Sequence, residues 1–361
     1  MNRLRQLHDA GVSIWLDTLS RELVEGGGFA RLIADCAVTG ATSNPTIFDK
    51  AITGSDSYDE QLRAAVAAGV HDPQELFFEL ALDDVRAAAG LLREAYDASA
   101  GRDGFVSFEC TPDLADDTAA TIEQAVGLWN RLALPNVMIK VPATAAGIPA
   151  IAELTARGVN VNITLLFSVA RYEQVIGAYL AGLERRVAAG QRIDTIASVA
   201  SFFVSRLDTK ADPLLAEDSG LRGRLAIANA RHAYARYRDR FADQRWRVLR
   251  DAGAKPQRPL WASTGTKDPS YSDVLYVEEL IAPDVINTMP EPTLRAFADH
   301  GQVSAMNMDA GAAEAVLRRA EEAGVDLPVL TAELEREGVR SFCDSYHDLL
   351  GSIEAKAEGR G

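Results

Sequence analysis

The sequence is short of cysteine, histidine and long apolar runs, and each shortage excludes a class of protein. Its three cysteines (Cys36, Cys110 and Cys343) are odd in number and widely spaced, so they form no metal-ligand spacing. A reduced, cytoplasmic setting is the simplest interpretation. The five histidines show no HxH or HExxH pattern, which disfavours a zinc enzyme. No run of about 18 apolar residues occurs, so the sequence predicts no membrane span.

Basic residues are also in the minority. The sequence has 37 Lys and Arg against 52 Asp and Glu, a net charge of −15, which argues against nucleic acid or an anionic membrane as a partner. An anionic substrate would need a local basic pocket. Residues 1–9 lack the apolar core of a signal peptide, so no export is expected. The length of 361 residues suits one large α/β domain or two smaller ones.

Short β-branched runs alternate with longer amphipathic stretches over most of the chain. This alternation predicts a (β/α)8 barrel, that is, eight parallel strands with intervening helices. The predicted strands cover residues 12–17, 40–43, 105–110, 137–141, 159–165, 195–201, 259–263 and 285–289. The clearest helical segments between them cover residues 73–96, 116–132 and 168–187.

After residue 289 the pattern changes to helices alone. Residues 312–323 and 330–354 have helical spacing, with Phe342 and Leu349 among the apolar positions of the second segment. We interpret them as the last barrel helix followed by additional C-terminal helices packed on the barrel. Because no linker or internal repeat divides the chain, the sequence predicts a single domain over residues 1–361.

One lysine lies in an apolar run. Of the six lysines, Lys140 alone follows Val137-Met138-Ile139 and precedes Val141, a pattern typical of a strand buried on both faces. An ammonium buried without a partner is costly, so such a lysine tends to lose its proton. The neutral amine can then form a Schiff base with a carbonyl. The alternatives are a structural lysine paired with a carboxylate, or one that extends to solvent at the strand end.

Most of the predicted strands end in polar side chains. In a barrel the carboxyl ends of the strands meet at one mouth, where catalytic groups gather. Each polar residue taken alone is typical of a cap between a strand and a loop. Six such strand ends together favour a catalytic site. They carry Asp17, the run Thr42-Ser43-Asn44, Glu109, Lys140, Asn162 with Thr164, and Ser201.

These residue types suit imine chemistry on a ketose. Lys140 supplies the amine, and dehydration of the first adduct needs a proton donor and acceptor such as Glu109, acting directly or through water. Cleavage of the carbon–carbon bond requires a base for the leaving hydroxyl, a role open to Asp17. Asn44 and Asn162 can form hydrogen bonds with sugar hydroxyls.

Two cationic segments follow the sixth and seventh strands. Ser201, Ser205 and Arg206 place hydroxyls and a guanidinium together, and Arg suits two-pronged contact with phosphate. Taken alone, an arginine such as Arg206 more often forms a surface ion pair, here with Asp208 as the nearby carboxylate. Lys267 ends the segment Thr-Gly-Thr-Lys (264–267), which lacks the spacing of a nucleotide-binding P-loop.

Four segments together resemble the transaldolase family. They are residues 42–48 (TSNPTIF), 137–144 (VMIKVPAT), 160–168 (NVNITLLFS) and 201–206 (SFFVSR). The resemblance extends from about residue 12 to 289 and implies a class I, Schiff-base aldolase-type barrel with its lysine on the fourth strand. It implies sugar-phosphate substrates and neither a metal nor an organic cofactor. The C-terminal helices resemble those of the longer members of the family.

The resemblance also implies roles for single residues. Lys140 is similar to the Schiff-base lysine, Glu109 to the acid/base that works through a water, and Asp17 to the proton acceptor in bond cleavage. The resemblance also implies that Lys267 is a second phosphate contact. Family members often carry an arginine at this position. The remaining implied substrate-binding residues are Asn44, Asn162, Thr164, Ser201, Phe203 and the phosphate ligand Arg206.

The implied function is a cytoplasmic transaldolase of the pentose phosphate pathway, a monomer or homodimer. It would transfer a dihydroxyacetone unit from sedoheptulose 7-phosphate to glyceraldehyde 3-phosphate, giving erythrose 4-phosphate and fructose 6-phosphate. One alternative is a lyase similar to fructose 6-phosphate aldolase, although such relatives are much shorter. A second is a non-catalytic barrel that binds phosphosugars, which has no need of Lys140, Glu109 and Asp17 together.

Overall fold

A closed barrel of eight parallel strands forms the centre of the protein. The computed structural model describes residues 2–304 and 308–359. Each strand pairs with its neighbours in sequence, and β8 closes the barrel on β1. The strands are β1 (Val12–Leu16), β2 (Val38–Thr42), β3 (Phe105–Glu109), β4 (Val137–Pro142), β5 (Val161–Leu166), β6 (Ser198–Phe203), β7 (Arg258–Ala262) and β8 (Val285–Met289).

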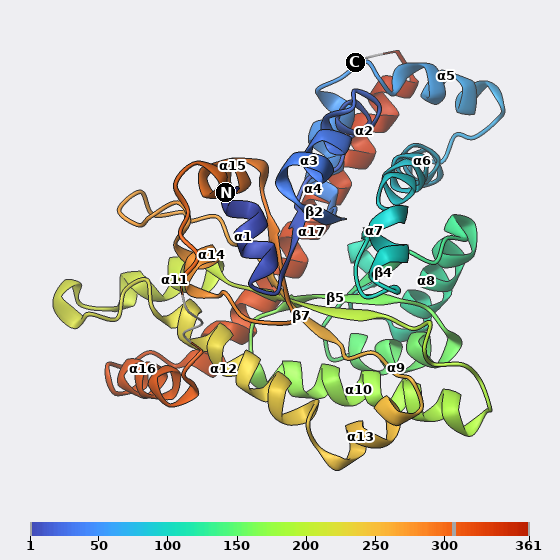
Figure 1. Cartoon of the computed structure of the whole chain (residues 1–361). Helices are drawn as coiled ribbons and strands as arrows, with labels where there is room; N and C mark the ends of the chain where they lie inside the picture. Colours follow the sequence, from blue (N-terminus) through green and yellow to red (C-terminus); the bar gives the residue numbers. More distant parts are fainter. Residues whose placement is uncertain (1, 305–307, 360–361) are drawn as a thin grey trace.

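Helices connect the strands and cover the outside of the barrel (Figure 1). In the first half of the chain they are α1 (Arg3–Asp9), α2 (Arg21–Glu25), α3 (Gly28–Cys36), α4 (Pro45–Thr53), α5 (Asp59–Ala67), α6 (Pro73–Leu91), α7 (Arg93–Ala98), η1 (Pro112–Leu114), α8 (Thr118–Leu132), α9 (Gly147–Arg157) and α10 (Val169–Ala188). In the second half they are α11 (Ser205–Ala211), η2 (Asp212–Leu214), η3 (Glu217–Ser219), α12 (Leu225–Arg240), α13 (Gln244–Asp251), α14 (Leu275–Glu279), α15 (Glu291–His300), α16 (Ala310–Glu322) and α17 (Leu327–Ala357). The η elements are short 3₁₀ helices.

The predicted (β/α)8 barrel is confirmed, and all eight predicted strands are present. The predicted helix over residues 73–96 is two helices, α6 and α7, which meet at Leu92. The assignment of residues 312–323 as the last barrel helix is wrong. Helix α15 follows β8 and packs on it, whereas α16 packs against α12. The propensity of the segment for helix was clear from the sequence, but its packing partner was not.

The long C-terminal helix α17 crosses the mouth of the barrel. In Figure 1 it runs from the side of α16 to the side of α5. It contacts α4, η1 and α11, which follow the carboxyl ends of β2, β3 and β6. Hydrogen bonds fix it there: Tyr346 donates to the Gln74 side chain at 3.0 Å, and Thr46 donates to Ser345 at 2.8 Å. Helix α17 therefore forms part of the wall around the carboxyl ends of the strands.

A polar network closes the opposite, amino end of the barrel. The Asp103 carboxylate accepts hydrogen bonds from the Trp15 indole and the Thr39 hydroxyl, both at 2.8 Å, and from Ser13. Ser13 in turn accepts from Arg258 at 2.7 Å. All five side chains therefore have partners within the protein, and this end has a structural role.

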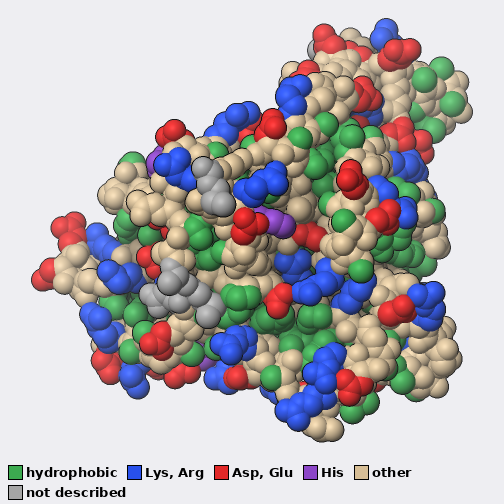
Figure 2. Space-filling view, viewed as in Figure 1, with side chains coloured by type: hydrophobic (Ala, Val, Ile, Leu, Met, Phe, Trp, Pro, Cys, Tyr) green, Lys and Arg blue, Asp and Glu red, His purple; other side chains and the backbone are tan. Residues whose placement is uncertain are grey.

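The described surface carries charges of both signs. Acidic and basic side chains are interspersed over the face drawn in Figure 2, on a chain whose net charge is −15. Within residues 2–304 and 308–359, no helix has the length and apolar content to cross a membrane.

The close packing of Trp15 on Gly40 predicts how a substitution of this glycine changes the stability of the protein. The two residues are paired across β1 and β2, and a Cβ atom on Gly40 would lie 2.4 Å from the indole ring. Trp15 is fully buried and its indole donates to Asp103, so its ring has little freedom to shift. We expect Gly40→Ala to lower the free energy of unfolding by about 1–3 kcal/mol, as overpacked substitutions do.

Gly127 in α8 is the control, because a Cβ there meets nothing within 4 Å. Gly127→Ala should stabilise the protein by roughly 0.5–1 kcal/mol, since glycine weakens a helix interior. Urea unfolding of both variants measures the difference, and equal effects would contradict the packing argument.

Candidate active site

Lys140 lies inside the barrel near the carboxyl end of β4, with only 5% of its surface exposed. The strand register aligns it with Glu109 on β3 and Asn162 on β5. Aligned residues of neighbouring strands project from the same face of a sheet, so the three side chains lie together. The Lys140 amine donates to a Glu109 carboxylate oxygen at 3.1 Å and to the Ser43 carbonyl at 3.2 Å. The predicted burial of Lys140 is confirmed, and the amine has a carboxylate partner.

The two predicted catalytic carboxyl groups both have perturbed acidity. Burial raises the pKa of Glu109 above its ordinary value, and the positive charge and hydrogen bond of Lys140 oppose this only in part. Burial also raises the pKa of Asp17, against the opposing effects of a Thr42 hydrogen bond and the Lys140 charge. Carboxyl groups whose pKa is moved toward neutrality are suited to general acid–base chemistry.

Asp17 accepts a hydrogen bond from Thr42, one of the polar strand-end residues, and Thr42 is in turn bonded to Thr288, which was not predicted as a site residue. The Thr42 hydroxyl donates to the Asp17 carboxylate at 2.7 Å, and Thr288 lies 2.7 Å from the same hydroxyl. Because Thr42 uses its proton on Asp17, Thr288 is the donor in the second bond. Thr288 lies on β8, so its contact with Thr42 on β2 is visible only in the closed barrel.

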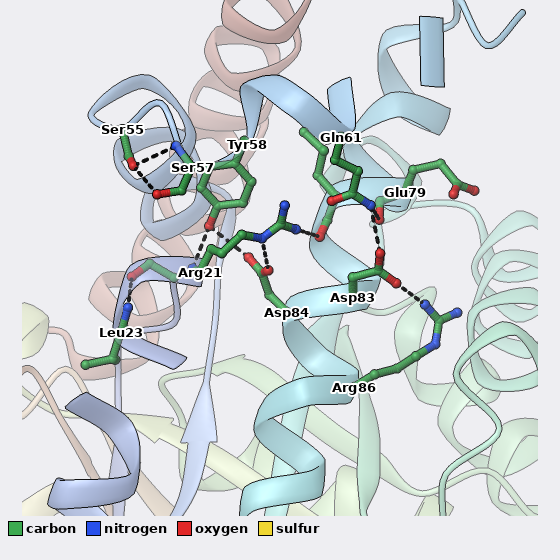
Figure 3. Close-up of polar contacts among 12 residues, drawn as sticks. Arg21, Leu23, Ser55, Ser57, Tyr58, Gln61, Glu79, Asp83, Asp84 and Arg86 are labelled. Atoms are coloured by element: carbon green, nitrogen blue, oxygen red, sulfur yellow. Dashed lines mark hydrogen bonds and ion pairs between the residues drawn. The ribbon is translucent and has the colours of Figure 1, made fainter. Parts of the chain in front are cut away.

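A buried ion pair anchors the segment that follows Asp17. Figure 3 shows Arg21, at the start of α2, beside Asp84 of α6 and Tyr58. The Arg21 guanidinium donates to Asp84 at 2.9 Å, and the Tyr58 hydroxyl donates to the other Asp84 oxygen at 2.8 Å. The Arg21 guanidinium also lies 4.5 Å from the centre of the Tyr58 ring. Removal of one partner from such a pair costs about 3–5 kcal/mol, so the short connection after Asp17 is held firmly in place.

Most of the predicted site residues line one pocket at the barrel mouth. Asn162 does not line this pocket but accepts a hydrogen bond from Ser201, which does, and Glu109 lines a small neighbouring cavity that shares Asn44 with it. Asn44 also caps α4, its side-chain oxygen accepting from the Ile47 amide at 3.0 Å. The predicted residues that line the pocket are Asp17, Asn44, Lys140, Thr164, Ser201, Phe203, Arg206 and Lys267.

A chain of hydrogen bonds supports the floor of the pocket. The Ser201 hydroxyl donates to the Asn162 side-chain oxygen at 2.7 Å, and the Asn162 amide donates to Ser107 at 2.9 Å. Thr164 differs from them: it is fully buried, and its hydroxyl has no hydrogen-bond partner within the part of the chain that the structure describes. Thr164 is among the residues that line the pocket, and a buried hydroxyl without a partner at such a place is suited to a bound polar group.

The two predicted phosphate residues lie on the same side of the pocket. Arg206 is in the first turn of α11, after β6, and Lys267 is in the loop after β7. The alternative pairing of Arg206 with Asp208 is wrong, because Asp208 accepts from the Tyr276 hydroxyl at 2.9 Å and from the Ala226 amide at 2.8 Å. Among the described residues, no carboxylate forms an ion pair with Arg206. The guanidinium is therefore available to an anion, whereas Lys267 is exposed at the rim.

Phe342 of α17 is the second feature that sequence reasoning missed. Its helical spacing identified it as part of an apolar face, but not as part of a site. In the structure its ring lines the pocket, with its centre 5.5 Å from the Lys140 amine and 6.0 Å from the Arg206 guanidinium carbon. Only the packing of α17 across the barrel mouth brings this residue to the pocket.

The fold and the pocket define a class: a (β/α)8 barrel with an amine, two carboxyl groups and a guanidinium at the carboxyl ends of its strands. The family model described as "Transaldolase/Fructose-6-phosphate aldolase" matches residues 14–353. A protein named "Transaldolase" from Saccharopolyspora erythraea is 51% identical over 99% of this chain and 98% of its own length.

Two further relatives agree. A "Transaldolase" from Thermobifida fusca is 49% identical, covering 97% of each chain, and one from Mycolicibacterium smegmatis is 46% identical over 98% of this chain and 97% of its own. The chain therefore belongs to the transaldolase/fructose-6-phosphate aldolase family, as its sequence motifs indicated.

Proposed function

We propose that this protein is a cytoplasmic transaldolase of the pentose phosphate pathway that works through a Schiff base on Lys140. It transfers a dihydroxyacetone unit from sedoheptulose 7-phosphate to glyceraldehyde 3-phosphate, giving erythrose 4-phosphate and fructose 6-phosphate. The proposed enzyme is a single domain, residues 1–361, that needs neither a metal nor an organic cofactor.

The observation that carries this proposal is the contact of the buried Lys140 amine with Glu109, 3.1 Å away, beside the pocket that Asp17 lines. The amine attacks the ketose carbonyl, and Glu109, whose raised pKa suits proton exchange, assists loss of water from the adduct, directly or through a water molecule. Asp17 takes the proton from the hydroxyl next to the bond that breaks. The enamine left on Lys140 then attacks the acceptor aldehyde, and Asp17 returns the proton to the new hydroxyl.

The remaining pocket residues match the rest of a sugar phosphate. Asn44, Ser201 and the unpartnered hydroxyl of Thr164 offer hydrogen bonds to the sugar hydroxyls. Arg206 and Lys267 supply positive charge at one side of the pocket, in a chain with a net charge of −15. Arg206 is half-buried and its charge is screened less than that of the exposed Lys267, so Arg206 supplies the stronger local attraction for an anionic substrate.

The family name covers a second activity, a lyase that releases free dihydroxyacetone. The transferase is favoured because relatives named "Transaldolase" share about half of their residues with this chain over nearly its full length. Product analysis with fructose 6-phosphate and no acceptor separates the two: a transferase stalls after one turnover, whereas continuous release of dihydroxyacetone would favour the lyase.

The first prediction concerns Lys140. Incubation with fructose 6-phosphate and borohydride should attach a reduced three-carbon unit to the peptide that contains Lys140, and mass spectrometry locates it. Lys140→Met should fold, because an apolar chain of similar length replaces the amine, and should give no adduct. Labelling of Lys50, Lys210 or Lys267 in its place would refute the assignment.

The second prediction separates the carboxyl groups. Glu109→Gln should slow formation of the imine, whereas Asp17→Asn should form it but fail to break the carbon–carbon bond. Each rate should fall about 10²–10⁴-fold, the usual contribution of a general acid or base. With borohydride, Asp17→Asn should therefore yield an intact six-carbon phosphorylated adduct on Lys140. A three-carbon adduct formed at the wild-type rate would contradict the role of Asp17.

The third prediction tests the phosphate contacts. Loss of a hydrogen bond to a charged group costs about 1.5–3 kcal/mol, so Arg206→Ala should raise KM for fructose 6-phosphate roughly 10- to 100-fold. Turnover of unphosphorylated dihydroxyacetone donors should change much less. Lys267→Ala should show the same pattern more weakly, because an exposed ammonium is a single, hydrated charge.

The matched control is Arg250→Ala on α13, an exposed arginine that is paired with Asp251 and does not line the pocket. It should leave both donors unaffected. Steady-state kinetics on the two donor types decides the matter, since equal losses on both would mean that Arg206 supports the fold and not the phosphate.

A further inference from the structure

The loop that carries Lys267 is attached to helix α11, which carries Arg206. The two segments meet where β7 ends and α11 begins. There the Ser205 amide donates to the Ser263 carbonyl at 3.0 Å, and the two side-chain oxygens of these serines lie 2.9 Å apart. The two cations proposed to bind phosphate therefore lie on segments that are bonded to each other.

The middle of this loop has no such attachment. Thr264 is fixed at the start, because its hydroxyl donates to the Asn287 side chain at 2.9 Å. Within the part of the chain that the structure describes, no hydrogen bond joins residues 265–270 to another element, and the exposed Lys267 forms no ion pair. The place of Lys267 therefore depends on how the loop is held on its far side.

Tyr271 holds that far side. Its hydroxyl donates to one Asp212 oxygen at 2.6 Å, and the Gly223 amide donates to the other at 3.0 Å. Gly223 has a φ of +70°, and a Cβ atom there would lie 2.8 Å from the Tyr271 ring, so glycine allows the ring to lie this close. Asp212 directly follows α11, and the bond thus returns the loop to the helix that carries Arg206.

A second bond of the same kind lies one helical turn away. Asp208 of α11 accepts from the Tyr276 hydroxyl at 2.9 Å and from the Ala226 amide at 2.8 Å. Each of the two aspartates thus joins a tyrosine of the chain after β7 to a backbone amide near the start of α12. The stretch that contains Lys267 is therefore closed at both ends by contacts with α11.

Lys267 also lies between the substrate pocket and a second cavity. Asp212, Tyr271 and Arg222 line this cavity, which shares Lys267 with the pocket at the barrel mouth. An Asp212 oxygen without its Tyr271 partner would compete with a substrate phosphate for the ammonium, since opposite charges attract over such distances. The Tyr271 hydroxyl occupies that oxygen.

We propose that Tyr271 and Asp212 are positioning residues that hold Lys267 at the phosphate end of the substrate pocket. This inference rests on the proposed function and deepens it, because it makes the phosphate contact depend on a bonded pair and not on the lysine alone. Neither residue lines the substrate pocket, so both act through Lys267. Loss of the bond weakens binding of a phosphorylated sugar and leaves the chemistry on Lys140 unchanged.

Tyr271→Phe tests the pair, because it removes the hydroxyl and keeps the ring. It should raise KM for fructose 6-phosphate about two- to fivefold, the contribution of an exposed ion pair, and leave kcat unchanged. KM for dihydroxyacetone, a donor without phosphate, should stay at the wild-type value. Glyceraldehyde is the acceptor in both assays, so that only the donor differs in phosphate.

A double variant shows whether the effect passes through Lys267. In the Lys267→Ala background, Tyr271→Phe should change KM no further, because the ammonium that it positions is absent. Tyr179→Phe is the matched control: it removes a hydroxyl that donates to the Lys255 carbonyl at 2.8 Å, and Tyr179 does not line the pocket. It should leave KM for both donors unchanged.

Three results would overturn the inference. Tyr271→Phe could leave KM for fructose 6-phosphate unchanged, it could raise KM equally for the two donors, or it could raise KM as much in the Lys267→Ala background as in the wild type. The proposed function fails separately, and only if the wild-type protein itself yields no borohydride adduct on Lys140.

Discussion

The pocket depends on the pairing of one buried amine with one buried carboxyl group. Lys140 projects from an otherwise apolar strand, and without Glu109 at 3.1 Å its ammonium would be buried with only the Ser43 carbonyl as a partner. Breaking such a pair costs about 3–5 kcal/mol, because it leaves a charge in a poorly solvated place. The contact requires β3 and β4 to keep their register, in which Glu109 faces Lys140. The register of β4 with β5 aligns Asn162 with the same lysine, so three of the proposed site residues lie side by side on neighbouring strands.

The two ends of the barrel differ in whether their polar side chains are bonded to one another. At the amino end, Asp103, Arg258 and their neighbours bond to one another, which stabilises the fold and leaves little for a ligand. At the carboxyl end, the Thr164 hydroxyl and the Arg206 guanidinium lack a partner of this kind among the described residues. A fold tolerates such groups at a site that a ligand completes, which agrees with the position of active sites in (β/α)8 barrels.

Helix α17 makes the C-terminal segment part of the functional region. Its residues contact helical elements that follow three different strands, and the Phe342 ring lies near both the amine and the guanidinium. A barrel with the same eight strands but without this helix would have a more open mouth. In this protein the surroundings of the amine are therefore set by an element outside the eight-fold repeat.

The strands could be predicted from the sequence because a strand buried in a parallel barrel is a local apolar run. The boundaries moved by up to three residues, as at β6, which begins at Ser198 where residue 195 was expected. Several helices were not predicted from the sequence. In α12, for example, four of the nine buried residues are alanines and one is Asn229, which gives a weak apolar pattern among the arginines of this helix. The segment 312–323 was assigned to the wrong place because a helical pattern does not identify the surface against which it packs.

The sequence by itself determined the order of eight strands, the apolar surroundings of Lys140, the polar residues at the strand ends and the family to which the chain belongs. Each of these is a property of neighbouring residues. The tertiary structure alone decided that Glu109 is the partner of Lys140, that Thr42 links Asp17 to Thr288, and that Phe342 lines the pocket. These contacts join residues far apart in the chain, and they exist only because closing the barrel and packing α17 across its mouth bring separate segments to one place.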